Sequence, residues 1–243
     1  MLEGLYSAAA GMSAQQRQMD VISDDLSNVS TTGYKAERVA FSDLLYSRVE
    51  QAGASTTVGA GASAQVIGRD NAEGAIGQTG KPLDLAIEGE GFFQVRRANG
   101  EVALTRDGAF DVDARGRLTS ADGSLVVPPI TLPAGTSPGD VVVSADGAVS
   151  AGTRTLGKIA LVTVPAPDKL LADGKGELTP NAASGAPRPA RGSRILQGAL
   201  ESSNVDMASE MVAMMGTQRS YQLASSAIKT EDQMMSIANQ LRA

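Results

Sequence analysis

The 243-residue sequence contains no cysteine, no histidine and no tryptophan, and it has only four phenylalanines and four tyrosines. Without cysteine and histidine there are no disulfides, thiol nucleophiles, imidazole bases or usual zinc ligands. Much of the 42% hydrophobic share is alanine and valine, which bury little area per residue. The sequence therefore favours a helical or thin β architecture and excludes most acid–base and nucleophilic designs for catalysis.

Three kinds of segment are also missing. The formal net charge is -6 and the 21 basic residues form no dense cluster, which argues against a nucleic-acid partner. No stretch reaches the roughly 18 apolar residues of a membrane span. The first twelve residues contain Glu3 but no lysine or arginine, and no apolar core precedes a small-residue cleavage site, so we expect no cleaved secretory signal.

Partial motifs for metal and phosphate binding have better structural interpretations. Residues 111–116 match the start of an EF-hand loop, but Arg115 occupies the fifth position and no helices flank it, so a hairpin turn within residues 112–118 is favoured. Gly89-Glu90-Gly91 lacks the third glycine of a phosphate loop, so we interpret it as a strand entry. We therefore expect no enzymatic activity, no cofactor, and no catalytic, cofactor-binding or metal-binding residues.

Apolar residues recur every seventh position near the N-terminus. They are Leu5, Met12, Met19 and Leu26, with Ala8, Ile22 and Val29 three positions further on and Gln15 as the one polar member. This spacing indicates the a/d seam of a coiled coil over about four heptads. It predicts a helix over residues 2–29, which the β-branched residues and glycine of residues 30–33 bring to an end.

A second stripe, richer in methionine, lies near the C-terminus. Its heptad members are Met207, Met214, Tyr221, Ile228 and Met235, flanked by Met211, Ala224, Ala227, Met234, Ala238 and Leu241. We expect this helix to open near Ser203, with Ser203 and Asp206 as a capping box, and to continue to about Arg242. Two alternatives remain: ordinary amphipathic helices packed on one globular domain, and an adaptable methionine-lined binding groove.

Between the stripes, turn signals alternate with short apolar runs. Hairpin-type dipeptides occur at residues 99–100, 107–108, 122–123 and 146–147, with strands expected at 92–95, 102–104, 125–127, 141–143 and 156–164. Residues 34–50 are interpreted as extended and partly helical, and residues 51–64 as a flexible connector or an arm that orders on assembly.

The predicted fold class is α+β, with two terminal helices that form a coiled-coil layer, extended arms and a central all-β domain. The predicted domains are a coiled-coil helix at 1–33, an extended arm and Gly/Ala-rich connector at 34–79, the β domain at 80–165, a Pro/Gly-rich return segment at 166–199 and a coiled-coil helix at 200–243.

Three ordered blocks resemble the bacterial flagellar rod and hook axial proteins. They include Asn28-Val29-Ser30-Thr31-Thr32-Gly33-Tyr34-Lys35 continuing to Leu45 and Tyr46, Gly91-Phe92-Phe93-Gln94-Val95 with Thr105-Arg106-Asp107-Gly108, and Leu200-Glu201 with Ser203-Asn204-Val205 and Gln218-Arg219. The chain departs from that family at Asp24-Asp25, where an asparagine pair is usual, and at Ser27, where alanine is common. The connection between residues 46 and 83 also looks shorter.

The resemblance implies a structural subunit, expected in the distal rod, of a helically arranged tube that crosses the cell envelope and transmits torque to hook and filament. It also implies export through the flagellar type III apparatus, self-association, contacts with other rod and hook proteins, and an inner layer made by the two termini. The alternatives are a proximal rod or hook-type subunit, or a soluble β-domain binding module dimerised by a closed coiled coil.

The expected assembly interface combines the two stripes with the signature residues beside them. It comprises Leu5, Met12, Met19, Ile22, Leu26, Asn28, Val29, Gly33, Tyr34, Asn204, Met207, Met211, Met214, Gln218, Tyr221, Ile228, Met235 and Leu241. Within this set, Asn28 is expected to cap the first helix and Gly33 to permit the turn into the arm.

Overall fold

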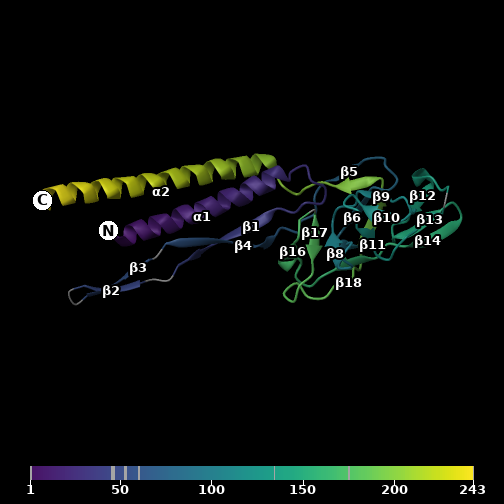
Figure 1. Ribbon diagram of the computed structural model, residues 1–243, viewed down its shortest axis with the longest axis horizontal. Coiled ribbons are helices and arrows are strands. Elements are labelled where there is room, and N and C mark those ends of the chain that lie inside the picture. Colours follow the sequence, from purple (N-terminus) through teal and green to yellow (C-terminus); the bar gives the residue numbers. More distant parts are fainter. Residues whose placement is uncertain are drawn as a thin grey trace. The chain divides into compact units, whose positions relative to one another are not determined.

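The computed structural model describes residues 2–44, 47–51, 54–59, 61–133, 135–174 and 176–242. Long helices lie near the two ends of the chain and a β-rich region with several sheets lies between them, which confirms the predicted α+β class (Figure 1). The chain divides into two compact units. We call residues 1–27, 37–67 and 206–243 the helical unit, and residues 28–36 and 68–205 the β unit.

The helical unit is built on an antiparallel pair of helices, α1 (Leu2–Ser27) and α2 (Met207–Arg242), whose free ends lie at the same end of the pair (Figure 1). The start of α2 differs from the prediction. Asp206 is the N-cap, because its carboxylate accepts hydrogen bonds from the Ala208 amide at 3.0 Å and the Ser209 hydroxyl at 2.8 Å. The Ser203 hydroxyl instead accepts a bond from the Val205 amide at 3.2 Å, so the predicted capping box is wrong.

The helical unit also contains paired strands where the sequence predicted an extended and partly helical segment followed by a flexible connector or an arm that orders on assembly. The strand β1 (Glu37–Asp43) pairs with β4 (Ala62–Arg69), and β2 (Ser47–Gln51) pairs antiparallel with β3 (Ala54–Val58) in the register Ser47↔Val58 to Gln51↔Ala54. Residues 56–58 are β-branched, which favours the strand over a flexible coil. Leu45 and Tyr46, which belong to the family resemblance, lie outside the described residues.

The largest sheet of the β unit has the strand order β16-β17-β8-β7-β11-β10-β9, and β15 joins it by pairing with β7 and β18. Its strands are β7 (Phe92–Arg96), β8 (Val102–Thr105), β9 (Phe110–Val112), β10 (Leu118–Ser120), β11 (Leu125–Val126), β15 (Leu161–Thr163), β16 (Leu171–Ala172), β17 (Glu177–Thr179) and β18 (Arg188–Pro189). The last three show that the Pro/Gly-rich return segment contributes to the sheet.

Three smaller sheets complete the β unit. The strands β12 (Val141–Val143), β13 (Ala148–Ala151) and β14 (Arg154–Lys158) form an antiparallel meander, β6 (Leu85–Glu88) pairs with β19 (Arg194–Gln197), and β5 (Ile76–Gln78) pairs with β20 (Ala199–Glu201). The single strand expected at residues 156–164 is therefore divided between β14 and β15, which belong to different sheets.

Three of the four predicted hairpin dipeptides are confirmed. Gly100, Gly123 and Gly147 have positive φ angles and follow turns between β7 and β8, β10 and β11, and β12 and β13, and each pair is antiparallel. Gly108 is different, because β8 and β9 are not paired with each other. A side chain at Gly108 would meet the Leu85 carbonyl oxygen at 1.6 Å, so this glycine is required by a close backbone approach.

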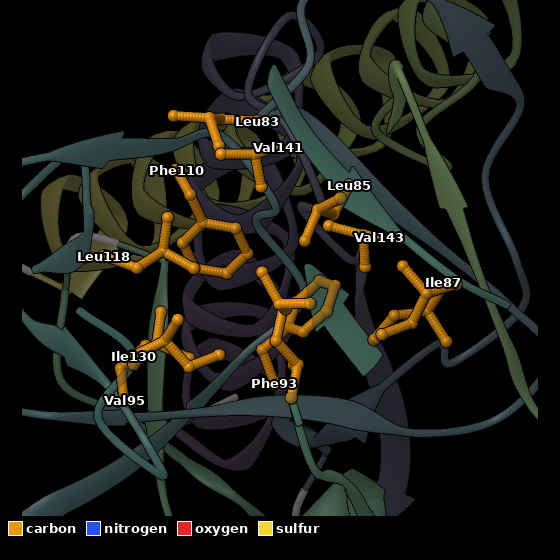
Figure 2. Close-up of a cluster of buried hydrophobic side chains, with 14 of the residues drawn as sticks. Leu83, Leu85, Ile87, Phe93, Val95, Phe110, Leu118, Ile130, Val141 and Val143 are labelled. Atoms are coloured by element: carbon orange, nitrogen blue, oxygen red, sulfur yellow. The ribbon is translucent and has the colours of Figure 1, made fainter. Parts of the chain in front are cut away.

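Successive side chains of β7 point to opposite faces, so its apolar residues enter two separate cores. Phe93 and Val95 enter the larger cluster, whose members include Leu83, Leu85, Ile87, Phe110, Leu118, Ile130, Val141 and Val143 (Figure 2). Phe93 and Phe110 meet edge to face, with ring centroids 5.1 Å apart. Phe92 points to the other side and enters a smaller cluster with Leu104, Val162, Val164, Leu170 and Leu178.

A buried ion network joins the segment after α1 to the segment before α2 within the β unit. The Glu201 carboxylate accepts a hydrogen bond from Lys35 Nζ at 2.5 Å and from Arg106 Nε at 2.6 Å. The Gly74 amide donates a third at 2.9 Å. Burial by itself raises the pKa of Glu201, but the hydrogen bond from Lys35, the Gly74 amide and the charge of Arg106 bring that pKa below its ordinary value.

Gly33 lies beside this network in a left-handed conformation, with φ of 66°, and its amide donates to the Glu201 carbonyl oxygen at 2.8 Å. A Cβ atom at Gly33 would lie 2.6 Å from the Arg106 carbonyl carbon and 2.8 Å from the Asp107 nitrogen. Glycine is therefore required here by both the backbone conformation and the space available.

We expect Gly33→Ala to destabilise the protein more than Gly123→Ala. Gly123 also has a positive φ, but a Cβ there would meet open space. The loss of stability in Gly123→Ala is therefore limited to the backbone strain of about 1–2 kcal/mol. Urea denaturation measures the free energy of unfolding of both variants. Equal losses would show that the Arg106 backbone moves aside without cost.

We expect Glu201→Gln to cost about 3–5 kcal/mol, because two buried cations lose their counter-charge. The control Glu101→Gln removes a carboxylate that is exposed and 4.0 Å from Arg97, and should cost less than about 1 kcal/mol. Chemical denaturation at neutral pH compares the two, and similar losses would contradict the assignment.

The lowered pKa of Glu201 predicts that acid destabilises the folded protein. Because the folded pKa of Glu201 lies below its ordinary value of 4.5, its stabilisation is fully present above about pH 4.5 and is lost as pH falls through the folded pKa. The free energy of unfolding should therefore fall more steeply below pH 4.5 in the natural protein than in Glu201→Gln. Parallel acid profiles for the two proteins would refute this source of acid sensitivity.

Candidate assembly surface

Apart from Met207, the predicted heptad residues of the two helices lie along the seam where α1 and α2 pack. Leu5, Met12, Met19 and Leu26 of α1 are half-buried, as are Met214, Tyr221, Ile228 and Met235 of α2. Ala14, Val21, Ile22 and Thr217 are fully buried. These residues therefore contribute to packing within the chain, and their spacing is that of a coiled-coil seam.

Other residues predicted for the interface are exposed. Met207, Met211 and Gln218 face solvent in the helical unit. Leu241 belongs to the last turn of α2, and its side chain lies outside the part of the structure that is described.

A second apolar face runs along α2, and we call it the outer face. It comprises Met211, Val212, Met215, Leu223, Met234 and Ile237, all exposed, with Leu223 at 72%. At about 100° per residue, most of this set lies roughly opposite Met214, Thr217, Tyr221 and Ile228, which pack toward α1, and Met211 lies at its margin. α2 is thus apolar on two sides, and only one of them is covered within the chain.

The outer face was missed in the sequence because the seven-residue pattern accounts for the other side of the helix. Val212, Leu223 and Met234 are spaced by eleven residues, and Met215 and Ile237 by twice that number. An eleven-residue repeat also keeps residues on one side of a helix, since eleven residues complete about three turns. From this eleven-residue spacing the outer face could have been predicted.

Two hollows flank the seam of the helix pair. One, of about 410 Å³, is lined by residues that include Met12, Gln16, Arg17, Asp20 and Tyr221. The other, of about 420 Å³, is lined by residues that include Gln15, Phe41, Ala213, Gly216 and Thr217. Both are open grooves lined by mixed polar and apolar side chains, and neither presents paired groups arranged for catalysis.

Carboxylates gather where the first turn of α2 meets the end of α1. Asp25 is buried and its carboxylate accepts a hydrogen bond from the Glu37 amide at 3.1 Å. Burial raises the pKa of Glu210, and the charges of Asp25 and Asp206 raise it further. Asp206 itself has a lowered pKa, because the Ser209 hydroxyl and the Ala208 amide donate to it. This end of the helix pair is therefore acidic and partly desolvated.

The remaining predicted residues belong to the β unit. Asn28 accepts hydrogen bonds from Thr31, from its amide at 3.0 Å to the Asn28 carbonyl and from its hydroxyl at 3.1 Å to the side chain. Val29 is half-buried nearby, and Tyr34 accepts a bond from the Asn204 amide at 3.4 Å. These contacts stabilise the turn that follows α1.

Asn204 connects three segments of the β unit. Its side-chain oxygen accepts from the Ala36 amide at 2.8 Å, and its side-chain nitrogen donates to the carbonyls of Asp70 at 2.9 Å and Ala72 at 3.2 Å. The structure thus brings Gly33, Tyr34 and Asn204 together around Glu201. Sequence reasoning missed the central role of Lys35, Arg106 and Glu201, because three separate charges in three separate blocks give no sign that they meet.

The described residues contain no group of three or more histidines, cysteines, aspartates or glutamates placed to hold a metal ion. Within the same part of the chain, no helix has the length and apolar character that crossing a membrane requires.

Comparison with known sequences identifies the family. Residues 5–35 match the flagella basal body rod protein family, residues 86–151 match the flagellar hook protein FlgE/F/G D1 domain, and residues 196–241 match the flagellar basal body rod FlgEFG protein C-terminal family.

Similar proteins align with nearly the whole length of this chain. The flagellar basal-body rod proteins FlgG of Caulobacter vibrioides and Borreliella burgdorferi are each 36% identical over 263 residues, covering 99% and 100% of this chain and 100% and 99% of the relative. The flagellar basal-body rod protein FlgF of Caulobacter vibrioides is 34% identical over 233 residues, covering 91% of this chain and 90% of the relative. This chain therefore belongs to the flagellar basal-body rod family that includes FlgE, FlgF and FlgG, and it is a structural subunit of that rod.

Proposed function

We propose that this subunit forms the distal rod by polymerising through α1 and α2 into a helical tube. In this proposal the helices make a coiled-coil inner layer that surrounds the export channel, and the β unit makes the layer outside it. The tube transmits torque to the hook and filament. Identity to FlgG relatives over nearly the whole of both chains supports the distal position.

The observation that carries the proposal is the outer face of α2. Six large apolar side chains are exposed along a helix whose opposite side is already packed. Large apolar side chains that recur along one exposed side of a helix are typical of an interaction site. Covering it would contribute on the order of 1 kcal/mol per side chain, because each is already partly shielded.

A second copy is the natural partner, because the family forms a rod. In this proposal the outer face of one copy packs against the grooves beside the seam of the next copy. These are two different surfaces, so the contact is heterologous. Contacts of this type do not close on themselves and generate open helical assemblies. A closed coiled-coil dimer would instead bury the same face of both copies.

We further propose that the subunit leaves the cytoplasm through the flagellar type III apparatus, without a cleaved signal peptide. It then assembles in the cell envelope with other rod and hook proteins. Membership of the flagellar basal-body rod family supports this route.

A proximal position is the second candidate, supported by 34% identity to the FlgF of Caulobacter vibrioides. Crosslinking in isolated basal bodies distinguishes the two positions, because this subunit would crosslink to different neighbouring proteins in each. Light scattering of the purified protein separates both from the soluble binding module, which would give a discrete dimer.

We expect Leu223→Glu to abolish polymerisation and motility while the monomer stays folded. The side chain is 72% exposed, so a charge there is tolerated in solution but would be desolvated in an assembled interface. Circular dichroism checks the fold, and sedimentation and swimming assays check the assembly.

Leu171→Glu is the matched control, because it makes the same change at an exposed leucine of the β unit. It should leave helix-driven polymerisation largely intact. If Leu223→Glu polymerised as well as the natural protein, the outer face would not be part of the assembly interface.

A further inference from the structure

The β unit contains a cavity of about 250 Å³ beside the buried ion network. The residues that line it include the cations Lys35 and Arg106, the polar residue Asn71 and the apolar residues Phe92, Val164 and Pro165. The two cations are 6% and 7% exposed. A cavity lined by buried cations and by apolar residues has the character of a binding site for a small organic anion.

The buried charges next to the cavity do not balance. Lys35 and Arg106 carry two positive charges, and Glu201, at 1% exposure, supplies one negative charge. Further carboxylates are near: Glu90 lies on the cavity wall, Glu73 accepts a hydrogen bond from the Gly89 amide at 3.3 Å, and Asp107 follows Arg106. Glu90 and Glu73 are solvent-exposed and Asp107 is half-buried. Among the buried groups, one positive charge is left in excess, which is unfavourable without an anion or water.

Donor capacity also remains on both cations. Lys35 has three N–H groups and donates to the Ala72 carbonyl and Glu201. Arg106 has five N–H groups and donates to Glu201 and to the carbonyls of Gly91 and Gly89. Beyond these bonds, within the described chain, one N–H group of Lys35 and two of Arg106 are available for an anion.

We propose that this cavity binds a carboxylate. A monoanion matches the single excess charge, whereas a phosphate dianion would overcompensate it, and charge-assisted hydrogen bonds from lysine and arginine are strong. The apolar walls accommodate the methylene groups that carry an aspartate or glutamate carboxylate. The ligand is either an acidic side chain of a neighbouring copy, in a chain with 27 acidic and 21 basic residues, or a free small carboxylate.

The first test is thermal unfolding of the full-length monomer in sodium propionate, compared with sodium chloride at equal ionic strength. Propionate at ten times its Kd should raise Tm by about 3–6 °C over chloride. Equal Tm values in the two salts up to high concentration would overturn the proposal.

The variant Asn71→Asp provides a second test, because it places a carboxylate on the cavity wall. It should raise Tm in chloride and remove the extra effect of propionate. Asn99→Asp is the control, since it adds the same charge at an exposed turn beside a different hollow, and it should keep the propionate effect. An unchanged Tm together with an unchanged propionate response in Asn71→Asp would also refute the proposal.

Polymerisation distinguishes the two sources of the carboxylate. If a neighbouring copy supplies it, propionate should slow polymerisation of the natural protein, and Asn71→Asp should slow it without propionate. If the ligand is a free carboxylate, polymerisation should proceed at the same rate in both salts. The Tm measurements are independent of assembly, so they stand whether or not the proposed rod contacts are correct.

Discussion

The Glu201 carboxylate is the contact on which the organisation of this chain depends. It lies in the strand that precedes α2 and pairs with Lys35, which follows α1, and with Arg106, which follows β8. Residues that are 166 and 95 positions apart in sequence are thus held at one point. The close approach at Gly33 and the three bonds of Asn204 add to the same joint, so residues 33–36 and 201–204 are held together within the β unit.

The helices beyond that joint carry more apolar surface than they can cover for themselves. The heptad residues give α1 and α2 a seam, while the eleven-residue spacing of Val212, Leu223 and Met234 gives α2 a second face. The two periods differ slightly in residues per turn, and their coexistence on one helix lets it pack on two sides. A rod subunit needs this property, because it must hold its own fold and also contact its neighbours.

Regular periodicity was predicted well from the sequence, and contacts between distant residues were not. Both helices, the hairpins at Gly100, Gly123 and Gly147, and the α+β class follow from local patterns. Gly108 was misinterpreted because the approach of the Leu85 carbonyl is invisible in the sequence. The extended character predicted for residues 34–50 is confirmed, but the helical and flexible character predicted within 34–64 was wrong, because strand pairing, supplied by a partner segment, outweighed weak local preferences. The buried charges were missed for the same reason.

The joint around Glu201 also has a mechanical consequence. The backbone segments after α1 and before α2 are tied to each other by the Gly33 amide and the Glu201 carbonyl, and by Asn204 and the Ala36 amide. A pull or twist that enters through either helix therefore reaches two covalent strands that are bonded side by side. Such strands share a load in parallel, and the buried ion pair between Lys35 and Glu201 resists their sliding past each other.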